Sequence, residues 1–502
     1  WHEIVEGVDL GDLKLNREFE ISQGETALTL NAKCFEAGMS SFAELCDLIE
    51  QDQLHGVPQT FEDRTYFDKS KRPDAAATLD FGGSAEDAAR LARALDFGRG
   101  YSNPVAVPKV RIKDVAYGVG EVEVLAAARD AASGEVIDVD DKACVVATRD
   151  GFLRLGLLSD ANGFELSPAT IVSAGDHLDA LSEEFATQLN ELASELAQNE
   201  SKFIARLERQ ADADLAGATA PKDEASCDWH SVTIEASGFA PADLVTSLSA
   251  YVGRTSGQAQ FQFGYCGPRL HDLRSAFAGY VAASIPLEVS FDETATLASL
   301  KKTSAKELEC LDASAGYSGD LGIRYPDLEA PSYSIGVRVS SETLDTEGLT
   351  GTIVTLALAE NNGATQCQLL FDVARFPKGA AAALARRIAA IAIVVRDDPQ
   401  KRISDLSLLT DAELETILYQ RNATEEPVDL AATVHTLFER QAASTPQSPA
   451  LVYRDQELTY AELDERANRI ANALVAKGVG PDALVGLYMT RTADLVIAAL
   501  GV

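Results

Sequence analysis

The stretch that most constrains the fold of this 502-residue chain lies near its C-terminus, at residues 434–502. Apolar runs on either side of residues 454–457 predict a short hairpin. Thr459 and Glu462 then have the spacing of a capping box, which predicts the start of a helix. Lys477-Gly478 suits the last turn of that helix, where a cation and a left-handed residue are favoured. The apolar positions of the helix recur at helical spacing: Leu463, Ala467, Ile470 and Leu474.

Residues 458–463 read L-T-Y-A-E-L, which resembles the first core motif (L-T-Y-x-E-L) of the adenylation domains of nonribosomal peptide synthetases. The preceding residues 434–446 are similar to the segment that leads into this motif. The resemblance implies that residues 433–502 are the N-terminal edge of an adenylate-forming domain. It also implies ATP with Mg and phosphopantetheine as cofactors of a parent enzyme, with sites outside this chain. The implied partners are a carrier domain and the rest of the adenylation domain.

The composition excludes several classes of function. The formal charge is −35, which argues against nucleic-acid or anionic-membrane binding, because both need a basic face. Seven cysteines are scattered singly, which predicts reduced thiols in a cytoplasmic protein, without disulfides or zinc. Six dispersed histidines predict no metal site. The most apolar run, residues 379–395, contains Arg386 and Arg387, so we expect no membrane span. Because residue 1 is Trp, we expect the natural chain to begin earlier.

The first 55 residues predict a tight turn, a strand and a helix. Residues 9–12 read D-L-G-D, in which Asp and Gly suit a turn. Residues 13–16 alternate like a strand. A long helix follows, with Thr26 as its candidate cap. We expect one face of this helix to meet a core through Leu30, Ala37, Phe42, Leu45 and Ile49.

This segment resembles the formyltransferase family, which includes methionyl-tRNA formyltransferases and the formylation domains of some peptide synthetases. His2, Asp9, Gly11 and Asp12 fit the H-(x)6-D-x-G-D element that ends the Rossmann-like catalytic domain of that family. The resemblance makes Asp9 the catalytic aspartate that orients a His and a water during formyl transfer from 10-formyltetrahydrofolate. Gly11 is the candidate cofactor-binding residue. The family's Asn and His motif is absent from this chain.

The spacing alone leaves other interpretations open for these residues. An aspartate in a D-x-G-D sequence is most often a turn residue, which would make Asp9 structural. The formyltransferase resemblance favours the catalytic interpretation. His2 has no family role as a base, and a solvent or packing histidine is the better interpretation.

A connector at residues 56–106 leads into a predicted all-β unit. Residues 107–172 contain several alternating runs, and Asp150-Gly151 between two of them predicts a hairpin. By its position this unit is similar to the OB-like domain that follows the formyltransferase catalytic domain. OB folds often bind nucleic acid, but acidic residues interrupt the basic ones here, so we predict none.

Residues 225–405 resemble the second lobe of condensation domains. Residues 229–234 and 260–265 predict strands, and residues 241–253 predict a helix whose Leu244, Leu248 and Val252 face inward. Residues 279–289 are similar to a G-x-x-x-N-x-x-P-L-R element, with Ser284 and Glu288 at two of its positions. Condensation requires H-H-x-x-x-D-G, and the sequence contains no adjacent His pair. We therefore expect no peptide-bond formation, and structural or surface roles for His230 and His271.

Together these patterns predict a multidomain fold of α/β and β classes. The predicted order is the end of a Rossmann-like formyltransferase domain (1–55), a connector (56–106), an OB-like β-barrel (107–172), a helical connector (173–224), a condensation-like α/β sandwich lobe (225–405), a linker (406–432) and the N-terminal edge of an adenylate-forming domain (433–502).

The predicted function is that of part of a peptide-synthetase loading module. Its parent would activate an amino acid with ATP and formylate an amine, and this piece alone would be inactive. The alternative is that the formyltransferase-like and condensation-like units are non-catalytic scaffolds for the adenylation domain. A third class is an accessory binding protein without synthetase activity.

Overall fold

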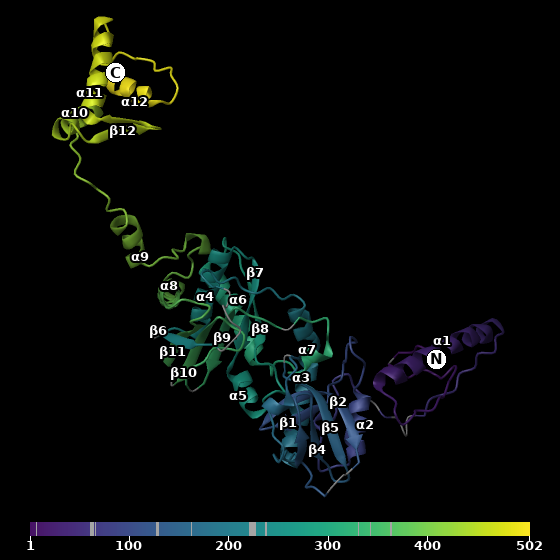
Figure 1. The fold of residues 1–502 in the computed structure, drawn as a ribbon. Helices are drawn as coiled ribbons and strands as arrows, with labels where there is room; N and C mark the ends of the chain where they lie inside the picture. The colour runs from purple at the N-terminus through teal and green to yellow at the C-terminus, as the bar shows by residue number, and fades with distance from the viewer. Residues whose placement is uncertain are drawn as a thin grey trace. The chain divides into compact units, whose positions relative to one another are not determined.

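The computed structural model describes residues 1–6, 8–60, 65, 67–126, 130–161, 163–219, 227–235, 238–329, 331–341, 343–361 and 364–502. The chain divides into two compact units, Trp1–Thr410 and Asp411–Val502 (Figure 1). The predicted boundary at residues 224 and 225 lies outside the described residues. The other predicted domain limits stay predictions.

The first sixty residues are built around one long helix, α1 (Ala27–Glu50). Thr26 caps it as predicted, because its side chain accepts from the Thr29 amide in a capping box. The expected strand at residues 13–16 is wrong: only Leu13 pairs, through isolated bridges to His2 and Val57. A ladder needs a neighbouring backbone along its whole length, and no described segment supplies one here.

The expected core face of α1 is also wrong. Phe42 and Ile49 are 51% and 57% exposed, and Leu30, Ala37 and Leu45 are only half-buried. The helix packs on the N-terminal residues, where the Trp1 indole donates to Ser41 Oγ at 2.9 Å and its ring lies 5.5 Å from the Phe42 ring at a tilt of 48°. Helical spacing predicted the apolar stripe correctly, but no described element covers it.

The next part of the first unit is an antiparallel sheet of five strands. Its strand order is β1-β2-β5-β4-β3, and α2 (Ala85–Ala94) buries Ala85 and Ala88 in the same core. The sheet is preceded by η1 (Asp74–Ala77) and followed by η2 (Pro168–Thr170). The strands are β1 (Lys109–Ile112), β2 (Val115–Leu125), β3 (Val136–Val139), β4 (Ala143–Ala147) and β5 (Phe152–Ser159).

The predicted hairpin at Asp150-Gly151 is confirmed, since β4 and β5 pair directly across it, with Val146 opposite Leu153. The closed OB-like barrel is not confirmed. In the described residues β1 and β3 are the two edges of an open sheet and do not pair with each other. Alternating side chains specify a sheet with one buried face, but they do not specify whether its edges meet.

A mixed sheet of six strands forms the largest core of the first unit. Its order is β6-β11-β10-β9-β7-β8, with β9 parallel to both β10 and β7 and the other neighbours antiparallel. The helices α4, α6 and α8 pack together as a layer against it (Figure 1). The strands are β6 (Trp229–Ile234), β7 (Gln260–Cys266), β8 (Ile285–Ser290), β9 (Ile335–Ser340), β10 (Val354–Asn361) and β11 (Ala364–Asp372).

The helices of this region are amphipathic, and several were predicted. The predicted helix at 241–253 is confirmed as α4, and its Leu244, Leu248 and Val252 are fully buried. The helix α3 lies in the predicted connector at 173–224, yet it buries Leu189 and Phe203 in the core of the six-stranded sheet. The helices are α3 (Glu183–Leu207), α4 (Pro241–Ser256), α5 (Pro268–Ala276), α6 (Leu297–Asp312), α7 (Leu321–Arg324), α8 (Lys378–Asp397) and η3 (Ile403–Asp405).

The second unit confirms the predicted hairpin and helix. Thr459 caps α11 in a capping box with Glu462, and Gly478 after its end has φ 87°. Leu458, Leu463 and Ile497 form its small core. The elements are α9 (Asp411–Glu415), η4 (Thr416–Gln420), α10 (Val434–Ser444), β12 (Pro449–Tyr453), β13 (Gln456–Thr459), α11 (Tyr460–Ala476) and α12 (Ala493–Gly501).

None of the helices in the described part of the chain is long and apolar enough to cross a membrane. The seven cysteines are all free thiols, as predicted. Three of them lie in the interior, where burial raises the pKa of the Cys144 thiol to about 11. The exposed ones are Cys34, Cys46, Cys227 and Cys310.

This difference predicts a staged thiol titration. In the native chain at pH 8, four thiols are expected to react quickly with a disulfide reagent, because the buried three are both inaccessible and protonated. All seven are expected to react in denaturant. The measurement is a spectrophotometric thiol count. Cys144→Ser should lower the denatured count by one thiol and leave the native count unchanged, and a lower native count would contradict the assignment.

Candidate functional site

The sequence-predicted site is an exposed turn near the N-terminus. Asp9 has φ 56°, a left-handed conformation that aspartate tolerates better than most residues. Its carboxylate Oδ1 lies 3.3 Å from His2 Nε2, and the two side chains are 68% and 39% exposed. The structure therefore brings together the His and the Asp of the H-(x)6-D element. His2 was expected to be a solvent or packing residue, although the spacing of the two residues carried the signal of a pair.

Gly11 is buried in this turn for a packing reason. A Cβ atom at this position would lie 1.9 Å from the carbonyl oxygen of Glu3, so no other residue fits without moving the backbone. The Glu3 amide also donates to the Asp12 carbonyl at 2.9 Å, which holds the two sides of the turn together. This contact accounts for the glycine of D-x-G-D, and a cofactor-binding role for Gly11 stays a prediction.

Gly11→Ala is expected to open the turn, because the methyl group overlaps the Glu3 carbonyl. An overpacked site of this kind costs about 1–3 kcal/mol in the free energy of unfolding. Thermal unfolding and hydrogen exchange over residues 1–15 measure the effect. Gly24→Ala is the matched control, since nothing lies within 4 Å of a Cβ there. Equal behaviour of the two variants would contradict the packing explanation.

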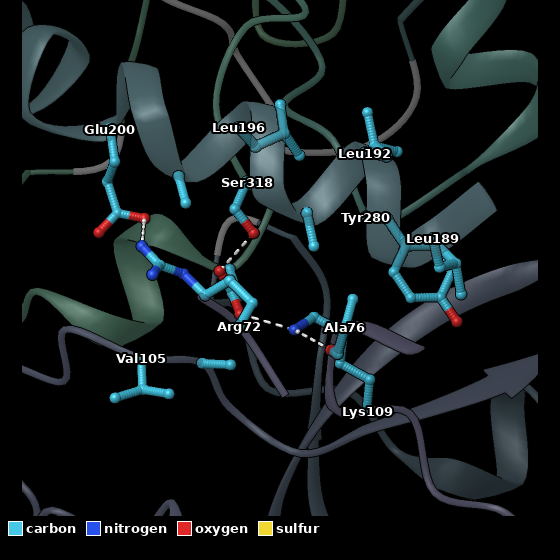
Figure 2. A pocket seen from close by; sticks show the side chains of 14 residues that line it. Arg72, Ala76, Val105, Lys109, Leu189, Leu192, Leu196, Glu200, Tyr280 and Ser318 are labelled. Carbon is cyan, nitrogen blue, oxygen red and sulfur yellow. Dashed lines mark hydrogen bonds and ion pairs between the residues drawn. The ribbon is translucent and has the colours of Figure 1, made fainter. Parts of the chain in front are cut away.

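A group of charged side chains is buried in the first unit. Figure 2 labels three of its members, Arg72 in the connector, Lys109 on β1 and Glu200 on α3. The other two are Asp320, which precedes α7, and Arg324, which ends it. Lys109 Nζ lies 2.6 Å from Asp320, and Arg324 Nε lies 2.8 Å from the same carboxylate. Arg324 Nη1 also donates to Glu200 at 3.0 Å, and Arg72 reaches Glu200 at 3.2 Å. We call these five residues the buried charge cluster.

The buried charge cluster is a structural device rather than a catalytic one. The three donors of Lys109 have three acceptors, Asp320 and the carbonyls of Ala76 and Val107. Burial lowers the pKa of Lys109, and Asp320 opposes that shift. Burial alone would raise the pKa of Asp320, but Lys109 and Arg324 bring it below its usual value. The neighbouring cavity is about 20 Å³, space for one water.

Two larger hollows lie elsewhere in the first unit. One of about 570 Å³ runs between residues 95–103 and the strands β2 and β5. The other, about 360 Å³, is more apolar and has Tyr317 and Glu329 among its lining residues. Both have the size of small-molecule sites. Neither contains Asp9 or Gly11, so the predicted site residues lie outside them.

The remaining predicted residues do not assemble into a site. His230 on β6 lies 3.5 Å from Asp228 and contacts the Phe371 ring. His271 is half-buried on α5. In the described ranges no group of three or more His, Cys, Asp or Glu side chains could hold a metal ion.

Over part of its length the chain is similar to proteins of known function. Residues 438–502 match the family of AMP-binding enzymes. One of the linear gramicidin synthase proteins of Brevibacillus parabrevis is 37% identical over 135 residues, which are 27% of this chain and 3% of that protein. Bacitracin synthase 2 of Bacillus licheniformis is 37% identical over 151 residues, 30% of this chain and 6% of that protein. The chain thus spans only a few per cent of the length of these relatives.

Solved structures of peptide synthetases align over more of the chain but more loosely. A four-domain nonribosomal peptide synthetase bound to AMP and glycine aligns with 66% of this chain and 29% of its own, at 15% identity and a TM-score of 0.48. A TM-score below 0.5 does not establish a common fold. The chain is therefore similar to nonribosomal peptide synthetases in sequence, with the start of an AMP-binding domain at residues 438–502.

Proposed function

We propose that this chain belongs to a nonribosomal peptide synthetase that activates an amino acid with ATP and formylates an amine. The match of residues 438–502 to AMP-binding enzymes supports the activation half of this proposal. ATP with Mg and the phosphopantetheine of a carrier domain would act at sites beyond these residues. The reactions are those of a cytoplasmic enzyme, and its partners are the other domains of the same synthetase.

The formylation half rests on one observation, the contact between His2 and Asp9 in a D-x-G-D turn. Formyl transfer from 10-formyltetrahydrofolate to an amine passes through a tetrahedral oxyanion, and the amine must lose a proton. A carboxylate that hydrogen-bonds an imidazole can hold that ring in one orientation and one tautomer. We assign this role to Asp9 and, from its position, make His2 its partner.

Residues 225–405 are proposed to be a condensation-like lobe without condensation activity. Their mixed sheet, covered by α4, α6 and α8, supports a layered α/β lobe. The sequence lacks the adjacent His pair that condensation requires, and His230 lies on β6 beside Phe371.

The experiment that tests the proposal uses the intact synthetase. Purified protein is given its amino acid, ATP and radiolabelled formyltetrahydrofolate, and label on the carrier-bound product is measured. Labelled product supports formylation, and amino-acid-dependent ATP–pyrophosphate exchange supports activation. Exchange without label would leave the activation half standing and overturn the formylation half.

A scaffold function is the second candidate, and the buried charge cluster favours it. The ion pairs of Arg72, Lys109 and Arg324 join the connector, the five-stranded sheet and the region of the six-stranded sheet. Units joined in this way can support a neighbouring domain without chemistry of their own. ATP–pyrophosphate exchange without formyl transfer is the result expected if these units are scaffolds.

A further inference from the structure

Among the described residues, the side chain of Gln59 holds the Asp9 turn from outside. Its Nε2 donates to the carbonyl of Asp9 at 3.0 Å and also to the carbonyl of Gly11. The two residues are 50 and 48 positions away in the sequence. Both hydrogens of the Gln59 amide are therefore used on two carbonyls of the same turn.

The backbone explains why Gln59 reaches this place. Leu13 and Val57 exchange two hydrogen bonds, of 2.9 and 2.8 Å, in an antiparallel bridge. In this antiparallel register, Gly11, two residues before Leu13, lies opposite Gln59, two residues after Val57. A longer ladder would continue there through backbone groups. Instead, the Gln59 side chain supplies the donors and continues the pairing around the bend at Asp9.

Few other residues could replace this carboxamide. A glutamate has no donor at neutral pH, and its charge would face two carbonyl oxygens. A leucine has a similar length but leaves both carbonyls of the turn without this partner. Because Asp9 is held at φ 56°, a conformation that is unfavourable for most residues, the turn depends on such outside bonds.

We propose that Gln59 is a positioning residue of the formyl-transfer site, which fixes the Asp9 turn so that the Asp9 carboxylate meets His2. The effect of Gln59 on catalysis rests on the proposed function. The ordering of the Asp9 turn by Gln59 does not depend on any activity. The two parts are tested separately.

The structural part is tested on the 502-residue chain by hydrogen exchange with mass spectrometry. Gln59→Leu and Gln59→Glu are expected to speed exchange in peptides covering residues 8–15 by about tenfold, because two hydrogen bonds are lost. Gln53→Glu, an exposed glutamine before the same segment, is the control and should leave exchange unchanged. Wild-type exchange rates in both Gln59 variants would overturn the inference.

The catalytic part is tested by formyl transfer in the intact synthetase. Gln59→Leu is expected to lower kcat about 100-fold with little change in KM for the formyl donor. A misplaced Asp9 carboxylate slows the chemical step but does not weaken binding of the donor. In an Asp9→Asn background the same change should cost less than about threefold, since Gln59 acts through Asp9. Equal losses in both backgrounds would overturn the positioning role. Wild-type protein that transfers no formyl group would instead overturn the proposed function. The hydrogen-exchange measurements would still decide whether Gln59 orders the turn.

Discussion

Asp9→Asn in the intact synthetase is expected to lower formyl transfer by about 10²- to 10⁴-fold while amino-acid activation continues. The amide keeps the size and shape of the carboxylate, but it cannot stabilise a positive charge on His2, whose Nε2 lies 3.3 Å from Asp9. The measurements are transfer of labelled formyl groups to the carrier and ATP–pyrophosphate exchange, made on the same preparation.

Asp52→Asn is the matched control for this variant. Asp52 is also an exposed aspartate of the first unit with φ 56°, but it follows α1 and lies outside the D-x-G-D turn. The control is expected to retain both activities. If Asp9→Asn lowers both activities together, Asp9 supports the structure. If it lowers neither, Asp9 is an ordinary turn residue and the scaffold function is favoured.

Arg324→Met is expected to have the largest effect on stability. The guanidinium is 1% exposed and lies between Asp320 and Glu200, so its loss leaves two buried carboxylates with one cation fewer. Breaking a buried ion pair from one side costs about 3–5 kcal/mol in the free energy of unfolding. Urea unfolding of the whole chain, followed by tryptophan fluorescence, to which Trp1 and Trp229 on β6 both contribute, measures this loss.

The control for the stability experiment is Arg90→Met. Arg90 pairs with Asp87 at 3.0 Å, but their side chains are 66% and 62% exposed, and an exposed pair contributes less than about 1 kcal/mol. A double change of Arg324→Met with Glu200→Gln should cost less than the sum of the two single changes, because they share one contact. An Arg324→Met variant as stable as Arg90→Met would show that the buried charge cluster does not hold the unit together.

The elements predicted correctly are those whose signals are local. The capping box of Thr459 and Glu462, the hairpin at Asp150-Gly151 and the inward face of α4 each follow from residues within a few positions of one another. Such signals act through hydrogen bonds and side-chain periodicity inside one element, so they can be recognised without knowledge of the rest of the chain.

The features that local patterns did not determine concern what an element packs against. The apolar stripe of α1 is present, yet Phe42 is half-exposed. The strands of residues 107–172 exist, but the described sheet is open between β1 and β3. The sequence indicates the charged face of α3, and only the structure shows that Leu189 and Phe203 on its other face are buried. The connector role of residues 173–224 stays a prediction. Periodicity identifies an apolar face and does not identify its partner.

Some features of the candidate site could be predicted from the sequence, and others required the folded structure. The D-x-G-D turn and the spacing of His2 and Asp9 follow from the sequence alone, because both depend on neighbours in the chain. The folded structure was needed to show that Gln59 closes this turn, and that Lys109, Glu200 and Arg324 share one buried cluster. The physical reason is distance along the chain: contacts between residues 48 to 211 positions apart depend on the packing of whole elements, which no local pattern records.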